Sequence, residues 1–115
     1  MAATKYNLTI EQGATFVKSI TIRDGATGLV RDLTNYTARG MIRINIDDVT
    51  PIAQFSFNTL DATGVFTFQL TSVQTTAFAF EKGVYDIELV QKNTSPENVE
   101  RILQGSVFLS KEVTR

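Results

Sequence analysis

Apolar and polar residues alternate along most of the chain, which is the pattern of β-strands with one buried face. The clearest run is 65–70, where Phe66, Phe68 and Leu70 occupy every second position. Similar runs begin near residues 5, 16, 37, 54, 84 and 99, and turn residues separate them. This spacing predicts an all-β fold, a two-sheet sandwich or a barrel and not a βαβ fold. Of these we expect an immunoglobulin-like antiparallel β-sandwich of two sheets with seven to nine strands.

The alternation also assigns faces within the predicted strands. Side chains expected to point to the core are Tyr6, Leu8 and Ile10 in the first run, Phe16, Ile20 and Ile22 in the second, Ile42, Ile44 and Ile46 in the strand 37–46, Phe55 and Phe57 in one strand near 54–58, and Tyr85, Ile87 and Leu89 in the strand 84–90.

Residues 71–80 have the spacing of a short helix. Thr71 or Ser72 can cap it, and Val73, Ala77 and Phe80 fall on one helical face. We expect one or two turns that close an end of the sandwich and stop at Gly83. Phe78 and Phe80 are assigned to the core, because exposed Phe pairs are uncommon on monomers.

Tyr85 follows Gly83 at the start of a late strand. A tyrosine near this point in immunoglobulin-like sandwiches anchors a corner by a hydrogen bond to the backbone. We therefore predict a structural corner at Gly83 and Tyr85. Gly40 and Gly105 lie inside predicted strands, where glycine marks a bulge or a close approach of two backbones.

Composition narrows the chemistry. The chain has 115 residues, which predicts a single domain over residues 1–115, and it contains no His and no Cys. These absences exclude a Ser-His-Asp triad, a thiolate nucleophile and His- or Cys-ligated metals. The net charge is −1, with 11 basic and 12 acidic residues, which disfavours nucleic acid and anionic membranes as partners. We expect no cofactor and no metal, and cytoplasmic synthesis, because no signal peptide precedes the first strand.

Two carboxylate pairs remain as candidates for chemistry. Asp47 and Asp48 are a candidate Ca²⁺ site that loop carbonyls, with or without Asp61, would complete, but the spaced acidic pattern of such loops is missing. Asp86 and Glu88 share one face of a strand and could do acid–base work. We favour a solvated loop for the first pair and an exposed sheet face for the second, so we predict no enzymatic activity.

Four stretches of the chain stand out by their order and spacing: 6–16 (YNLTIEQGATF), 32–39 (DLTNYTAR), 83–89 (GVYDIEL) and 103–115. They resemble a family of small phage virion proteins. Their order and spacing are similar to those of the β-sandwich domain at the N-terminus of baseplate upper proteins and related tail-cluster products. Asn35 stands where that family would have Gly, and the long second region of baseplate upper proteins does not follow.

The resemblance implies a non-enzymatic structural component of a bacteriophage particle, found in the virion and in the host cytoplasm during assembly. It implies docking onto other virion proteins in the tail or baseplate, in many copies or as a homo-oligomer. Capsid decoration and a carbohydrate-binding adsorption module are the alternatives, the latter disfavoured by the absence of Trp. The candidate interface arms are the two chain ends: Ala2, Ala3, Thr4 and Lys5, and Ser110, Lys111, Glu112, Val113, Thr114 and Arg115.

Overall fold

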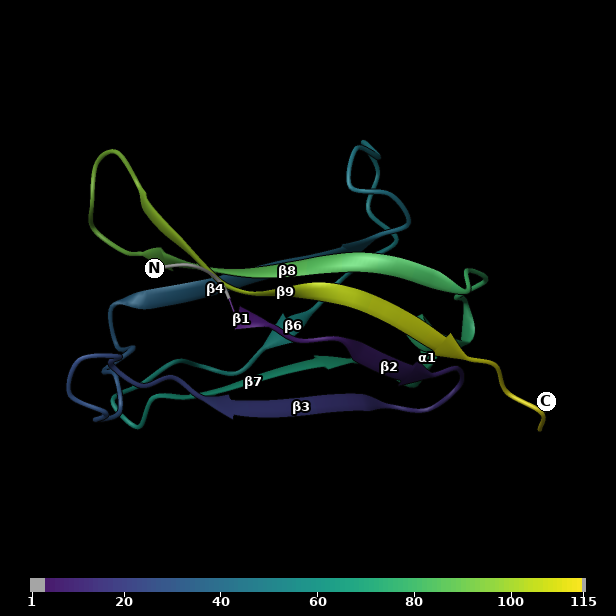
Figure 1. The fold of residues 1–115 in the computed structure, drawn as a ribbon, viewed down its shortest axis with the longest axis horizontal. Coiled ribbons are helices and arrows are strands. Elements are labelled where there is room, and N and C mark those ends of the chain that lie inside the picture. Colours follow the sequence, from purple (N-terminus) through teal and green to yellow (C-terminus); the bar gives the residue numbers. More distant parts are fainter. Residues whose placement is uncertain (1–3, 115) are drawn as a thin grey trace.

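Two β-sheets pack face to face in the computed structural model, which describes residues 4–114 (Figure 1). This confirms the predicted all-β sandwich, and the described residues form nine strands and one helix. Their bounds are β1 Thr4–Lys5, β2 Leu8–Glu11, β3 Phe16–Thr21, β4 Tyr36–Arg43, β5 Ala53–Gln54, β6 Ser56–Phe57, β7 Val65–Leu70, α1 Ser72–Thr76, β8 Lys82–Gln91 and β9 Asn98–Ser110.

The larger sheet, sheet A, has the order β1-β9-β8-β4-β5, with β2 also on β9, and sheet B has the order β3-β7-β6. The orders β9-β8-β4 and β3-β7-β6 correspond to the G-F-C and B-E-D strands of immunoglobulin sandwiches. The sandwich is not wholly antiparallel, because β1 and β2 run parallel to β9. Alternation within a strand carries no information on the direction of its neighbour, so the sequence could not show this.

The core contains the alternating apolar residues of the long strands. Phe66, Phe68 and Leu70 of β7 are fully buried, as predicted, and they face Ile87 and Leu89 of β8 within one apolar cluster. Leu8 and Ile10 of β2 are buried as well. The predicted inward faces of β2, β7 and β8 are therefore confirmed.

The apolar run around Phe55 contributes a short strand to each of the two sheets. The sequence predicts one strand there, but β5 pairs with β4 in sheet A and β6 pairs with β7 in sheet B. Phe55 lies between the two short strands, where it is 6% exposed. Its ring meets those of Phe68 and Tyr85 edge-on, with centroids 5.3 and 6.0 Å away. The chain thus changes sheet at a buried aromatic residue.

Two predictions for strand faces are wrong. β4 ends at Arg43, so Ile44 and Ile46 lie in the following loop with 50% and 78% of their surface exposed. Tyr6 lies between β1 and β2 and is 39% exposed, because the strand is interrupted there. In both places the apolar alternation continues beyond the hydrogen-bonded ladder that would bury it.

The predicted helical turn is present as α1. Thr71 is its N-cap, and its hydroxyl and the Gln74 side chain form a reciprocal capping box. The predicted buried face is wrong, since Val73 is 80% exposed. Instead Thr75 is buried, where its hydroxyl donates to the Ala14 carbonyl (2.9 Å). Phe78 and Phe80 follow α1 and are buried, as predicted.

Gly83 and Tyr85 each make a close contact with the backbone of a distant segment. Gly83 lies inside β8, where a Cβ atom would be 2.7 Å from the Arg43 carbonyl oxygen of β4. The Tyr85 hydroxyl donates to the Tyr6 carbonyl, 79 positions earlier in the chain. Tyr85 therefore attaches the N-terminal segment to sheet A. A hydrogen bond over this distance in sequence has no local signature.

Tyr85 should keep its proton at a higher pH than an unfolded tyrosine does. Burial raises the pKa of Tyr85 to about 12, against about 10 for an unfolded tyrosine. Because the folded state keeps the proton longer, stability should fall as the pH rises from about 10 towards 12. Phenolate absorbance should show a late titration step that is lost in Tyr85→Phe. A late step that persists in that variant would contradict this expectation.

Candidate protein-binding surfaces

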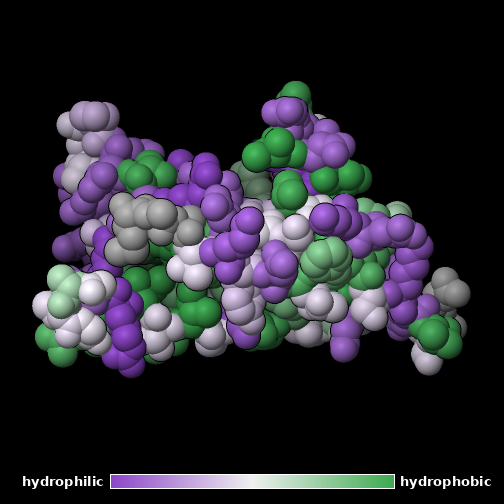
Figure 2. Space-filling model, viewed as in Figure 1, coloured by the Kyte–Doolittle hydropathy of each residue, from purple (hydrophilic) through white to green (hydrophobic). Residues whose placement is uncertain are grey.

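The outer face of sheet A is hollowed between two projecting loops, 44–52 and 92–97. Both loops rise from the same side of the sandwich in Figure 1, and the space-filling view in Figure 2 shows the recess between them. We call this recess, with a volume of about 610 Å³, the trough. It is lined by Lys5, Asn7, Arg39, Gly40, Met41, Arg43, Ile46, Val84, Tyr85, Asp86, Glu88, Arg101, Gln104, Gly105 and Ser106.

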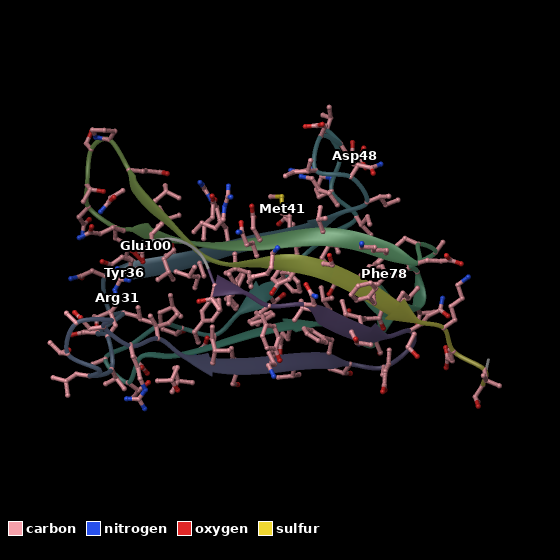
Figure 3. All side chains as sticks on the ribbon, in the orientation of Figure 1. Arg31, Tyr36, Met41, Asp48, Phe78 and Glu100 are labelled. Atoms are coloured by element: carbon pink, nitrogen blue, oxygen red, sulfur yellow. The ribbon has the colours of Figure 1, made fainter. Side chains whose placement is uncertain are left out.

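Charged side chains from three adjacent strands form the floor of the trough. Arg39 of β4 pairs with Glu88 of β8 (2.8 Å), and Asp86 of β8 pairs with Arg101 of β9 (3.5 Å). The strand register places Arg39 directly opposite Glu88. Arg101 also lies opposite Glu88, so its contact with Asp86 is diagonal along the strands. Met41 stands between the loops in Figure 3 and adds an apolar surface.

Asp86 and Glu88 do point outward together, as the sequence predicts, but each has a guanidinium partner. Burial raises the pKa of Asp86, and the charge of Arg101 partly opposes that rise. The side-chain hydrogen bond from Arg39 to Glu88 raises the pKa of Arg39. The four side chains form two cross-strand ion pairs. Such a charged surface can recognise complementary charges on a partner.

Loop 44–52 is held upright by its own polar groups. The Arg43 guanidinium donates to the carbonyl oxygens of Asp48 and Val49, both at 3.1 Å. The Asp48 carboxylate accepts the N–H of Asn45 (3.0 Å). Asp61, the third member of the candidate Ca²⁺ site, lies in the turn before β7 and accepts from Thr63. The structure therefore does not bring Asp61 together with Asp47 and Asp48, and residues 4–114 contain no other cluster of three potential metal ligands.

Sheet B has an open edge at β3. β3 pairs with β7 alone among the described strands, because both N-terminal strands joined β9. The Ile22 N–H donates to Gly64 at 2.9 Å, so the even-numbered residues of β3 bond to β7. Alternation then points the backbone groups of Val17, Ser19 and Thr21 away from the sheet. These groups are available to another strand.

The candidate arms are partly attached to the sandwich. Thr4 and Lys5 form β1 and pair with Leu103 and Gln104, while Ala2, Ala3 and Arg115 lie outside the described residues. Ser110 ends β9, and the remaining residues follow it: Lys111 approaches Glu81 (3.8 Å), the Glu112 N–H donates to Gln12 (3.0 Å), and Val113 and Thr114 are exposed. Their predicted role as interface arms stays a prediction.

The basic residues of the trough were not predicted from the sequence. Arg39 and Arg43 flank Met41 at every second position, which indicates a shared outward face. Arg101 comes from a strand about 60 positions later, and only the pairing of β8 with β9 brings it beside them. The sequence therefore indicates that Arg39 and Arg43 share a face, but it does not show that Arg101 joins them, because that follows from the order of the strands in sheet A.

The chain matches no protein-family model, and no curated protein is similar to it in sequence. Within residues 4–114, the structure has no helix of the length and apolar character needed to cross a bilayer.

Proposed function

We propose that this chain is a non-enzymatic structural component of a bacteriophage particle, which docks onto other virion proteins in the tail or baseplate. The assignment to a phage rests on the four stretches that resemble small virion proteins. The assignment to docking rests on the open edge of β3, whose outward backbone groups at Val17, Ser19 and Thr21 can pair with an extended segment of a neighbour. Its compartments are then the virion and, during assembly, the host cytoplasm.

Strand addition suits this edge for two reasons. The six residues of β3 are flanked by polar turns and carry exposed side chains at alternate positions, so a partner strand gains main-chain hydrogen bonds without entering the core. Lys18 lies over the Tyr6 ring at 5.0 Å. A lysine at an edge strand discourages unspecific pairing with other sheets. The edge therefore stays unpaired until it meets a partner strand that accommodates the lysine.

Peptide mass spectrometry of purified particles, split into tail and capsid fractions, tests the assignment. We expect the chain in the tail fraction at several copies per particle. Recovery from capsids at high copy number would instead indicate a decoration protein. Absence from both fractions would overturn the proposal.

A single substitution tests the edge itself. Ser19→Pro removes an outward N–H that makes no ladder bond to β7, so we expect incorporation into particles to fall at least tenfold while the fold persists. Ser19→Ala is the matched control, because it removes only the hydroxyl contact to Thr67 (2.8 Å). Equal incorporation of both variants would exclude β3 as the docking edge.

A further inference from the structure

The trough and loop 44–52 have complementary charge. Four basic side chains line the trough, Lys5, Arg39, Arg43 and Arg101, against the two acidic side chains Asp86 and Glu88, which leaves an excess of two positive charges. The whole chain has a net charge of −1, so this excess is local. Loop 44–52 contains Asp47 and Asp48 and no basic residue.

The apolar surfaces of the two features also correspond. Ile46 and Val49 of the loop are 78% and 93% exposed, so the loop presents two aliphatic side chains to solvent. Met41 and Val84 provide apolar area in the trough, between the charged side chains. A segment with two carboxylates between two aliphatic side chains therefore has the composition that the trough would bind.

The loop is organised in advance of any binding. Arg43 bonds to the carbonyls of Asp48 and Val49, and Asp48 bonds to Asn45, so the tip is fixed. Asp47 is exposed and its side chain makes no hydrogen bond or ion pair within residues 4–114. Because the loop is already rigid, it loses little conformational entropy when it docks. The Asp47 carboxylate is available to pair with a basic group of the partner.

From these observations we propose that two copies of this chain dimerise face to face, with loop 44–52 of each copy seated in the trough of the other. Loop 44–52 projects from the side of sheet A on which the trough opens (Figures 1 and 2). A loop therefore reaches the trough of a copy that faces it, and that copy returns the contact. The result is a closed two-fold dimer and not an open chain.

This inference uses the outer face of sheet A and leaves the edge of β3 free. It therefore holds or fails independently of the proposed phage function, and it is tested on the purified chain alone. Sedimentation velocity over a dilution series should show a monomer–dimer equilibrium at low salt. The dimer should weaken as salt is added, because the contact is partly electrostatic.

Asp47→Lys and Lys5→Glu test the two sides of the contact. Each substitution turns an attraction into a repulsion twice in a two-fold dimer, so each should weaken dimerisation roughly tenfold or more. Neither residue makes an ion pair within residues 4–114, so the melting temperature should not change. Glu11→Lys is the matched control for Asp47→Lys, since it makes the same charge change at an exposed residue of β2 outside the trough.

Mixing the two weakened variants gives the sharpest result. In a mixed pair, the lysine introduced at position 47 of one variant meets the glutamate introduced at position 5 of the other. The second contact of that pair is native, so dimers should reappear at about wild-type concentrations. A wild type that stays monomeric up to millimolar concentration would overturn the proposal. So would Asp47→Lys behaving like Glu11→Lys, or a mixture that stays monomeric.

Discussion

Phe55→Ala should lower the free energy of unfolding by about 3 to 5 kcal/mol, the range for deleting a buried aromatic side chain. Phe55 is 6% exposed, and its ring lies within 6.5 Å of four other rings, those of Phe16, Phe57, Phe68 and Tyr85. These rings come from both sheets, so the cavity would open between the layers, where neither sheet can collapse without moving the other. Denaturant unfolding followed by circular dichroism measures the loss.

Phe108→Ala is the matched control for this prediction. Phe108 is 41% exposed on the outer face of sheet A, with the Lys82 ammonium 5.7 Å from its ring. The same deletion there should cost less than about 1 kcal/mol. If Phe55→Ala does not fold, Phe55→Leu keeps most of the volume and should cost about 1.5 kcal/mol. Equal losses at positions 55 and 108 would show that Phe55 does not connect the sheets.

Gly105→Ala should detach the N-terminal segment and destabilise the protein by about 3 kcal/mol, the upper range for overpacking. A Cβ atom at position 105 would overlap the Tyr6 carbonyl oxygen and lie 2.8 Å from its carbon. That carbonyl accepts the Tyr85 hydroxyl, and the Tyr6 N–H donates to Gln104 (2.8 Å). Moving Tyr6 therefore breaks two hydrogen bonds and strains the pairing of β1 and β2.

Hydrogen exchange locates this effect. Amides of β2 and of its neighbour β9 should lose protection first, because Leu8 and Ile10 are buried only while β2 is paired. Gly25→Ala is the control, since no atom lies within 4 Å of a Cβ there and its φ is not positive. That change should leave stability the same or slightly higher. Uniform loss of protection in Gly105→Ala, or none, would contradict the proposed attachment.

The sequence predicts the elements of this fold better than their partners. The alternation in 65–70 and 84–90 correctly gives two buried strand faces, and of the two predicted caps, Thr71 and Ser72, Thr71 is the N-cap of α1. These features depend on neighbours within a few positions. Phe55 shows the limit, because an unbroken alternation cannot reveal that hydrogen-bonding partners change in the middle of it.

The candidate surfaces are harder to predict from the sequence, because each combines residues from strands that are distant in the chain. Asp86 and Glu88 are predictable as an outward pair, but their partners Arg101 and Arg39 come from other strands, and the register decides the pairing. The open edge of β3 exists because β1 and β2 pair with β9. The Tyr6 backbone between β1 and β2 is held against sheet A by the close approach of Gly105 and by the Tyr85 hydroxyl, and both residues are far from Tyr6 in the sequence.

The parallel pairing of β2 with β9 has a consequence for synthesis on the ribosome. Leu8 pairs with Val107, so β2 emerges early and must wait until almost all of the described chain has been translated before its partner exists. During that interval, Leu8 and Ile10 are exposed apolar residues on a nascent chain. Pairing over such sequence distances is typical of β-proteins that fold in milliseconds to seconds. Sheet A therefore stays incomplete on the ribosome until β9, the partner of β1, β2 and β8, has been made.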